Sequence, residues 1–585
     1  MYHHPNNSFM KTSTCLLLIS IHCVFFAQHS KAESGLLPLL PEDTVFLLEV
    51  DDWKELGQSI ESGPLGEFSG SKAWGEMTEW TEQKMKSELG NDSKKIELLF
   101  ERLEEWGESV SGGMVLAVGN LEKLLSKQMP DFTLLLETGA TQSKLEETLR
   151  WMKKEGTSSE GGFSWEREKI AGEMVHWIGP DNAKEKEQRV AVLLVDQTLG
   201  ILAGGEDHVR ETILRMEGES ESMDGNDNYL DLFDEINRGA ARMFIDFVPL
   251  QALIEQAEAS PDMQFPENPF GVTTTSLISA MGLDSMECLG LQIDPSGKNL
   301  VLSSAAFFSK YEGIFSFLQN EANTEVIQYG FIPTQAFTAT SVRYDFAQIW
   351  PTMEKMITGL SPQLMLLVNS QIQAFEEKSG VAFRRDVMGT LGDEAFSFSL
   401  LPGRVQSIED FEKSSDFFGI SLTDSKLFDR SLRTMVDSVA PGNDLFTERV
   451  HRGVTIRKLR GLEESGISLS YAVTDKWLLL AMGQDNQLNQ IINRMNGKGR
   501  SLWEKKEVQQ ALADLPEDTN QLEFADFEKL VKFLTSLAVI ALESEGEIEM
   551  KASDFPDFPY FLIGWSKNVR RGIIAEAKLY PKPDR

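Results

Sequence analysis

The chain has 585 residues and carries 56 lysines and arginines against 91 aspartates and glutamates, which gives a formal net charge of −35 at pH 7. Such a negative charge repels polyanions, so it argues against nucleic acids and anionic membrane surfaces as main partners. The length is sufficient for a large hydrophobic core, and the fold therefore needs neither a metal ion nor disulfide bonds to hold it together.

The first 32 residues have the order of features that is typical of a signal peptide. Lys11 supplies a positive charge, residues 15–27 form an apolar stretch of 13 residues, and Ser30 and Ala32 place small residues before a cleavage site. A membrane-spanning helix needs roughly 20 apolar residues, so this stretch is too short to cross a bilayer. We therefore predict that residues 1–32 are a signal peptide.

Cleavage before Glu33 would remove Lys11 and Lys31 but no acidic residue, so the mature chain would carry a charge of 54 − 91 = −37. The location that follows is the periplasm or the exterior of the cell. An N-terminal helix of the core is the alternative interpretation. The sequence does not decide whether translation starts at Met1 or at Met10.

Short runs of β-branched and apolar residues follow in chain order and predict strands. In the first half of the chain they cover residues 45–50, 114–118, 132–136, 175–178, 190–195, 243–245, 288–293 and 300–305. Many neighbouring runs are separated by short turns, which antiparallel hairpins allow and parallel crossovers do not. The predicted fold class is therefore α+β, with largely antiparallel sheets and with helices packed on a sheet face.

Four β-rich runs end in an aspartate that is followed by an aromatic residue and, three positions after it, by an aliphatic one. The four aspartates are Asp52, Asp246, Asp345 and Asp526. An aspartate at the N-cap of a helix accepts a hydrogen bond from a free backbone N–H and complements the positive helix end. We therefore predict four strand-to-helix corners of one type. A metal-binding or catalytic role of these carboxylates is the alternative.

Similar segments recur in the same order and at a nearly constant distance, which indicates a duplicated unit. Residues 143–145 match residues 425–427 at an offset of 282, and residues 202–207 resemble residues 480–485 at an offset of 278. We therefore predict two tandem copies of one α+β unit after the signal peptide, namely residues 33–325 and residues 326–585.

Several of the repeated motifs also carry a family resemblance. Leu-Pro-Glu-Asp-Thr stands at residues 40–44 and again at residues 515–519. Residues 375–391 are followed by Gly-Asp-Glu-Ala at residues 392–395, and Leu-Ala-x-Gly-x-Asp marks the start of a helix in each half. Together these motifs resemble a family of exported bacterial proteins, the domain of unknown function 3352 type. The resemblance implies the fold and export, and it implies no activity.

Cysteine and histidine are too few for the usual transition-metal sites. Outside the leader only Cys288 remains, so the mature chain has no internal disulfide, and we interpret this residue as a small core side chain; a reactive thiol is the alternative. His176, His208 and His451 have no partner at ligand spacing, and we interpret each as a sheet or helix-surface residue. We predict no zinc, copper or iron.

Other functional motifs are incomplete. Ser109 lacks the last glycine of a nucleophile elbow, and no phosphate loop with Walker spacing is present. Asp224, Asn226, Asn228 and Glu235 have the spacing of an EF-hand-like loop, but Tyr229 stands where the turn glycine belongs, so we predict a turn that leads into a helix. The 11 tryptophans are scattered, which favours core packing over a sugar-stacking surface.

The sequence therefore names no catalytic, cofactor-binding or metal-binding residue and predicts no cofactor. We predict an exported non-enzymatic binding or interaction protein whose partner is an unknown protein or small molecule, with no membrane span after removal of the signal peptide. An exported carboxylate-dependent hydrolase is an alternative, because 91 acidic residues offer many pairs. A carrier of an apolar ligand is another, motivated by the apolar helix predicted at residues 530–542.

Overall fold

The computed structural model describes residues 35–583, apart from a number of internal segments. The segments outside the description are residues 73, 77–78, 80–108, 127, 157–162, 181–185, 219–220, 237–238, 260–269, 296–298, 319–325, 403–413, 440–444, 462–467, 484–486, 498, 546–550 and 552–553. The predicted signal peptide, residues 1–32, lies outside the described residues.

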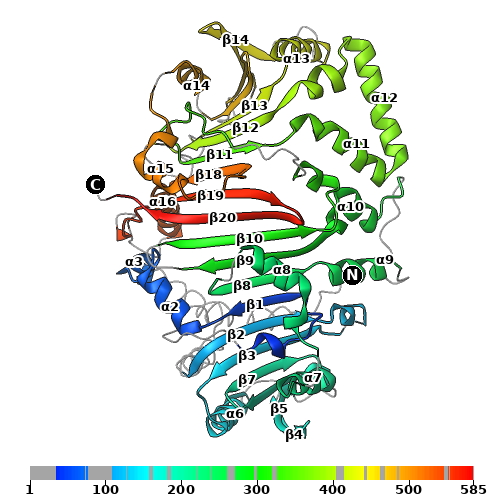
Figure 1. Ribbon diagram of the computed structural model, residues 1–585, viewed down its shortest axis with the longest axis vertical. Coiled ribbons are helices and arrows are strands. Elements are labelled where there is room, and N and C mark those ends of the chain that lie inside the picture. The colour runs from blue at the N-terminus through cyan, green and yellow to red at the C-terminus, as the bar shows by residue number, and fades with distance from the viewer. Residues whose placement is uncertain are drawn as a thin grey trace. The chain divides into compact units, whose positions relative to one another are not determined.

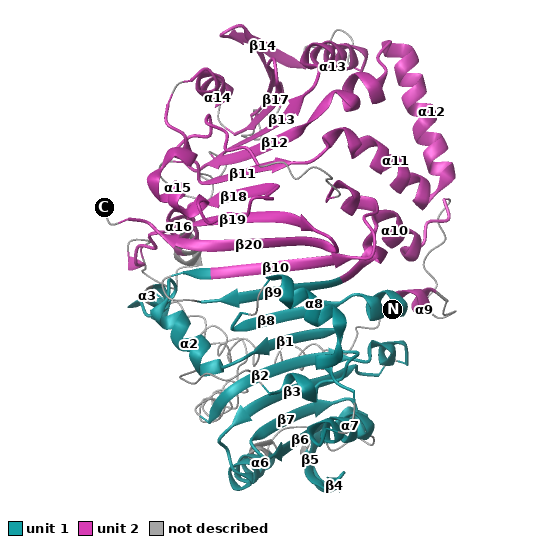
Figure 2. Ribbon diagram, in the orientation of Figure 1, with its two compact units in different colours: residues 1–253, 288–300 teal, residues 254–287, 301–585 magenta. Residues whose placement is uncertain are grey.

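The chain divides into two compact units, which Figure 2 shows in different colours. Unit 1 consists of Met1–Leu253 and Cys288–Leu300, and unit 2 consists of Ile254–Glu287 and Val301–Arg585. These units are defined by spatial contact. The predicted copies, residues 33–325 and 326–585, concern repetition in the sequence, and their boundary stays a prediction.

Unit 1 contains an antiparallel sheet in the strand order β9-β8-β1-β2-β3-β7-β6-β5-β4 (Figure 1). Its strands are β1 (Phe46–Val50), β2 (Val110–Gly119), β3 (Asp131–Thr138), β4 (Phe163–Ile170), β5 (Glu173–Pro180), β6 (Val190–Val195), β7 (Thr198–Ala203), β8 (Ala241–Asp246) and β9 (Met286–Asp294). Every second residue of β8 is buried, because successive side chains of a strand point to opposite faces of the sheet.

Helices cover the core face of this sheet. They are α2 (Trp53–Ser62), α3 (Gly66–Ser69), α6 (Gln142–Gly156), α7 (Glu206–Met216) and α8 (Asp227–Ile236), with α9 (Val248–Ala259) following β8. Short 3-10 turns are η1 (Leu37–Leu39), η3 (Leu121–Ser126), η4 (Lys186–Gln188) and η5 (Met223–Gly225). Trp53 and Leu56 of α2 pack on Val110 and Met114 of β2, so the first predicted corner buries its aromatic and aliphatic residues against the sheet.

Unit 2 contains an antiparallel sheet in the order β20-β19-β18-β11-β12-β13-β17-β16-β15-β14, and β10 (Leu300–Phe308) pairs with β20. Its strands are β11 (Thr338–Arg343), β12 (Leu391–Leu400), β13 (Ser415–Leu422), β14 (Phe446–His451), β15 (Val454–Leu459), β16 (Leu469–Val473), β17 (Trp477–Met482), β18 (Gln521–Ala525), β19 (Tyr560–Val569) and β20 (Gly572–Pro581).

The helices of unit 2 are longer and more numerous than its turns. They are α10 (Thr274–Met281), α11 (Ile349–Leu360), α12 (Pro362–Ser379), α13 (Ser425–Val439), α14 (Gln487–Met495), α15 (Lys506–Leu512) and α16 (Phe527–Glu545). Short turns are η7 (Leu283–Ser285), η8 (Gly313–Leu318), η9 (Phe346–Gln348), η10 (Phe383–Val387), η11 (Met388–Thr390) and η14 (Leu502–Glu504). None of the helices in the described ranges is long and apolar enough to cross a membrane.

The two sheets share one strand order. When β1–β9 are numbered onto β11–β19, the sequence of neighbours in unit 1 repeats in unit 2. The register between the second and third strands also shifts at the same place, between Val110 and Met114 in unit 1 and between Leu391 and Ala395 in unit 2. The predicted class, α+β with largely antiparallel sheets, is confirmed, and the common strand order supports the inference of duplication.

All four predicted corner aspartates follow a strand and cap the helical segment after it. Each carboxylate accepts a hydrogen bond from the backbone N–H two or three residues further on, at 2.8 Å for Asp52, 2.9 Å for Asp246, 3.1 Å for Asp345 and 3.2 Å for Asp526. The N-cap prediction is therefore confirmed, and these aspartates have the local role that cap preferences explain.

Candidate functional site

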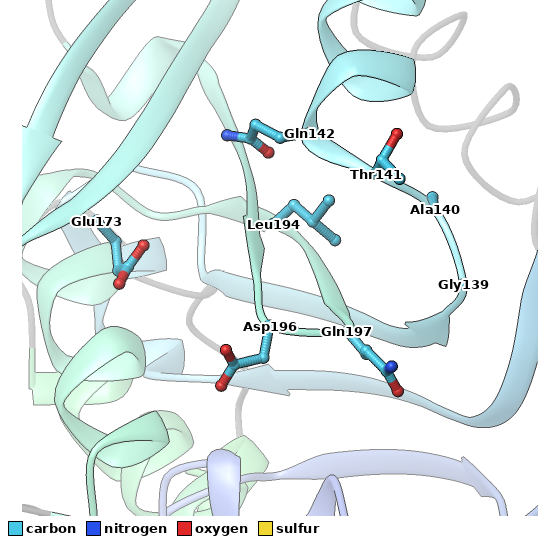
Figure 3. A pocket seen from close by; sticks show the side chains of 8 residues that line it. All are labelled: Gly139, Ala140, Thr141, Gln142, Glu173, Leu194, Asp196 and Gln197. Carbon is cyan, nitrogen blue, oxygen red and sulfur yellow. The ribbon is translucent and has the colours of Figure 1, made fainter.

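A pocket of about 530 Å³ lies on unit 1 where three connections between secondary-structure elements meet (Figure 3). The first connection joins β3 to α6, the second joins β4 to β5, and the third joins β6 to β7. The pocket is lined by Gly139, Ala140, Thr141, Gln142, Glu173, Leu194, Asp196 and Gln197. Its volume lies in the range of small-molecule sites.

Backbone hydrogen bonds and turn geometry hold the lining residues in place. The N–H of Thr138 donates to the carbonyl oxygen of Gln197 at 2.7 Å, which ties the β6–β7 turn to the end of β3. Ala171 and Gly172 have φ of 47° and 90°, the left-handed conformations that a two-residue hairpin turn requires, and this tight turn places Glu173 at the start of β5.

The pocket presents oxygen acceptors and negative charge. Glu173 is half-buried and Asp196 is exposed, and neither carboxylate makes an ion pair with any residue that the structure describes. The Oε1 atom of Gln142 is buried and has no hydrogen-bond partner in the described part of the chain. Leu194 is the one large apolar side chain in the lining, and no basic side chain contributes to it. The pocket therefore suits a polar ligand that donates hydrogen bonds.

Beside the pocket, the structure brings Ser109 and Lys144 together, which the sequence did not predict. The Nζ atom of Lys144 donates to the Ser109 hydroxyl at 3.0 Å, and the Ser109 carbonyl accepts from the Gly139 N–H at 2.8 Å. A lysine activates a serine only as a neutral amine, a state that deep burial favours. Lys144 is half-buried, so the contact fixes the β3–α6 connection and does not make a nucleophile.

A second polar cluster in unit 1 contains His208, a residue that we predicted at a helix surface. That prediction is wrong, because His208 lies on α7 but is buried against the sheet. Its Nε2 atom lies 2.9 Å from the Thr133 hydroxyl and its Nδ1 atom 3.8 Å from the Asp131 carboxylate. Lys123 forms an ion pair with Asp131 and donates to the Gly204 carbonyl at 2.8 Å. Since Thr133 is also buried, this cluster secures α7 to the sheet and is closed to a substrate.

Burial lowers the pKa of His208, against the opposing effect of Asp131, and burial likewise lowers the pKa of His176. The unfolded state then binds more protons, so this stabilisation is complete above the unfolded pKa of about 6.5 and is lost as the pH falls toward the folded pKa. We expect urea unfolding to show a free energy that decreases from about pH 7 to about pH 5, by at most about 1.4 kcal/mol per pH unit for each histidine. A His208→Gln variant should show a shallower decrease, and an unchanged slope would contradict the assignment.

The acidic loop with EF-hand-like spacing forms the start of a helix, as predicted. Asn226 accepts a hydrogen bond from the Tyr229 N–H at 2.9 Å and caps α8, which begins two residues before Tyr229. The Tyr229 hydroxyl donates to the buried Glu49 carboxylate at 2.6 Å, and Arg242 pairs with the same carboxylate at 2.9 Å. Burial raises the pKa of Tyr229, so this hydroxyl stays a hydrogen-bond donor.

The remaining predicted residues have structural roles. Cys288 is a free, fully buried thiol on β9, which confirms the core interpretation. His176 lies on β5, as expected of a sheet residue, and is buried; His451 ends β14, with Nε2 3.0 Å from Asn493 Oδ1. Core packing is confirmed for the buried tryptophans Trp53, Trp177, Trp477 and Trp503. Within the described residues, no group of three His, Cys, Asp or Glu side chains is placed to hold a metal ion.

The Gly-Asp-Glu-Ala motif at residues 392–395 lies in unit 2 and holds a buried carboxylate. Glu394 accepts a hydrogen bond from the Lys476 ammonium group at 2.9 Å and from the Tyr329 hydroxyl at 3.3 Å. Burial, followed by the Glu394 charge, raises the pKa of Tyr329. Lys476 belongs to the β16–β17 turn of unit 2, the counterpart of the β6–β7 turn at the pocket of unit 1.

Three neighbouring helices of unit 2 form an uncharged helical surface, which comprises α10, α11 and α12 (Figure 1). Their fully buried residues are only Thr352 and Met365, within the described ranges. Their exposed apolar side chains are Leu277 (43% exposed), Met353 (42%), Leu366 (70%) and Leu367 (49%). A sequence signal marks this surface, because residues 356–375 contain no charged residue although 25% of the chain is charged.

Comparisons with known proteins concern the family and distant structures. Residues 299–541 match the family model described as a protein of unknown function, DUF3352. No curated protein matches the chain. Crystal form III of TP0453 is 8% identical, with 52% of this chain and 90% of that chain covered and a TM-score of 0.24; crystal form I is 7% identical, with 49% and 84% covered and a TM-score of 0.24. The family resemblance found in the sequence is thus confirmed, and residues 299–541 belong to the DUF3352 family of proteins of unknown function.

Proposed function

We propose that this protein is an exported, non-enzymatic binding protein and that the pocket of unit 1 is its ligand site. The observation that carries the proposal is the concave surface of about 530 Å³ whose lining includes unpaired carboxylates and a buried, unpartnered amide oxygen. Buried acceptors without partners destabilise a folded chain, so a ligand that donates hydrogen bonds to them is favoured. The single large apolar side chain in the lining, Leu194, argues against the alternative of an apolar ligand at this site.

A thermal-shift screen of small polar molecules tests this proposal. We expect some of them to raise the unfolding temperature of the mature chain in a saturable manner, because a ligand that binds only the folded state stabilises it. An Ala140→Trp variant, in which a large side chain fills part of the pocket, should lose the response. If no compound shifts the wild type, or if the variant responds equally, the pocket is not the ligand site.

Hydrolysis by paired carboxylates is the competing function, and the pocket supplies the pair Glu173 and Asp196. A carboxylic acid that works as a general acid near neutral pH needs a pKa raised by burial. Glu173 is only half-buried and Asp196 is exposed, so the geometry favours binding. A panel of nitrophenyl glycosides and esters distinguishes the two functions, since turnover that disappears in a Glu173→Gln variant would overturn the non-enzymatic proposal.

A second candidate function is protein interaction through the uncharged helical surface of unit 2. Exposed leucines without neighbouring charges resemble the core of a protein interface, where charged residues are depleted. A photoreactive residue at Ser370, one turn after Leu366 and Leu367, should form an adduct of defined mass with a partner protein in the producing cell. The same residue in a Leu366→Glu/Leu367→Glu background should form none. A lipid adduct, or no adduct, would count against a protein partner.

Export has its own test. We propose that the signal peptide is removed and that the mature chain begins at Glu33. Mass spectrometry of the protein recovered from the periplasm or the medium should find this N-terminus. An intact Met1 or Met10 in that fraction would overturn the proposal.

A further inference from the structure

We propose that the pocket of unit 1 recognises a small organic cation with an ammonium group. The inference rests on the proposed binding function of this pocket and names the chemistry of its ligand. Glu173 and Asp196 bring two carboxylates to the lining, which contains no basic side chain. A ligand ammonium group would supply the missing counter-charge and form charge-assisted hydrogen bonds with these oxygens.

The uncharged lining atoms favour the same ligand. The Oε1 atom of Gln142 is buried without a partner in the described part of the chain, and this oxygen can only accept hydrogen bonds. An ammonium group carries three N–H donors and no acceptor, so it can satisfy a carboxylate and an amide oxygen together. Figure 3 shows Gln142, Glu173 and Asp196 around the same pocket, on three different connections.

Unit 2 provides an internal comparison at its β16–β17 turn. Leu422 N–H donates to the Lys476 carbonyl at 2.7 Å, as Thr138 N–H donates to the Gln197 carbonyl at 2.7 Å in unit 1. Lys476 therefore occupies the position that Gln197 has at the pocket. The ammonium group of Lys476 is bound by the Glu394 carboxylate at 2.9 Å, so the corner of unit 2 contains an ammonium group of its own.

A second position of the pocket differs in the same sense. The β14–β15 turn of unit 2 has Arg452 and Gly453 at φ of 51° and 82°, the conformations found in the β4–β5 turn of unit 1. The first strand residue after the turn is Val454 in unit 2 and Glu173 in unit 1. Unit 2 thus has a lysine and one acid fewer at this corner, whereas unit 1 has two acids and no lysine. This contrast indicates that unit 1 takes its ammonium group from a ligand.

The size of the pocket distinguishes an organic cation from a metal ion. A water molecule occupies roughly 30 Å³ in the liquid, so about 530 Å³ exceeds the volume of a bare ion many times. Calcium needs about six to eight oxygen ligands at roughly 2.3–2.6 Å. The lining supplies two carboxylates and two side-chain amides, on an open surface, which fits a molecule of several heavy atoms better.

Calorimetric titration of the mature chain with 1,4-diaminobutane tests the assignment, with 1,4-butanediol as the matched neutral probe. We expect saturable binding of the diamine, weakened by salt, and no binding of the diol. Glu173→Gln and Asp196→Asn should each weaken the diamine at least about tenfold, because each removes a charged hydrogen-bond acceptor. Gln197→Lys, which introduces the lysine of unit 2, should have a similar effect.

Asp475→Asn is the matched control, because Asp475 precedes Lys476 as Asp196 precedes Gln197, and its affinity for the diamine should equal that of the wild type. Circular dichroism confirms that each variant folds, and Asp196 and Gln197 are exposed turn residues. Binding of the diol, succinate or calcium in preference to the diamine, when it is lost in Ala140→Trp, would keep the pocket as a binding site and overturn the cation assignment. Undiminished diamine binding by Asp196→Asn would also overturn it. A negative result in the whole thermal-shift screen would instead overturn the proposed function.

Discussion

Replacement of Arg242 by Met is expected to lower the free energy of unfolding by about 3–5 kcal/mol, because it leaves the Glu49 carboxylate buried without its counter-charge. Arg242 and Glu49 face each other across β1 and β8, and they are 5% and 2% exposed. Two guanidinium nitrogens reach the Glu49 carboxylate, at 2.9 and 3.1 Å. Although burial alone would lower it, the Glu49 charge raises the pKa of Arg242, which therefore stays charged.

An exposed ion pair in the same unit provides the matched control. Arg210 pairs with Glu206 one turn away on α7, with side chains 46% and 40% exposed. Arg210→Met should therefore change the unfolding free energy by about 0.5 kcal/mol or less. Urea unfolding followed by tryptophan fluorescence measures both variants. Equal effects of the two substitutions would show that the buried pair is not required, and a Glu49→Gln/Arg242→Met double variant should recover part of the loss.

The elements that the sequence predicted well are those with a local signal. β1 was expected at residues 45–50 and spans Phe46–Val50, and the corner aspartates lie where cap chemistry places them. β4 was not predicted, because its exposed residues Glu166, Arg167 and Lys169 interrupt the apolar pattern. β4 is the last strand in the order of unit 1, and charged residues on such an edge strand hinder pairing with another chain.

The pocket could not be predicted, because its residues come from distant parts of the sequence. Gln142, Glu173 and Asp196 meet only because β3 pairs with β7, which in turn pairs with β6. Nothing local in the sequence determines that β3 skips three strands before it finds this neighbour. The same holds for the pair of Glu49 and Arg242, which are 193 residues apart. By contrast, the uncharged run at residues 356–375 is a local signal that could have indicated the exposed helical surface.

Replacement of Phe396 by Ala is expected to cost about 3–5 kcal/mol, the usual effect of removing a buried phenylalanine ring. Phe396 follows the Gly-Asp-Glu-Ala motif on β12 and is 1% exposed. Its ring lies 4.8 Å from that of Phe331 and 5.1 Å from that of Trp477, both nearly perpendicular to it. Phe418→Ala, on the neighbouring strand β13, is the matched control, because that ring is 38% exposed and its loss should cost less.

Gly419 shows why this ring fits and allows a sharper test. Gly419 is the cross-strand partner of Phe396, and a Cβ atom added to it would lie 2.3 Å from the Cε1 atom of that ring. Gly419→Ala should therefore be destabilising by about 1–3 kcal/mol in the wild type, because the core has no room for the methyl group. In a Phe396→Ala background the methyl group enters the vacated space, so the combined cost should be smaller than the sum of the two single costs by at least about 1 kcal/mol. Strict additivity in urea unfolding would show that the ring does not pack on Gly419, whereas coupling of this sign would establish that the glycine is needed for the packing of the aromatic side chain and not for the turn chemistry of the motif.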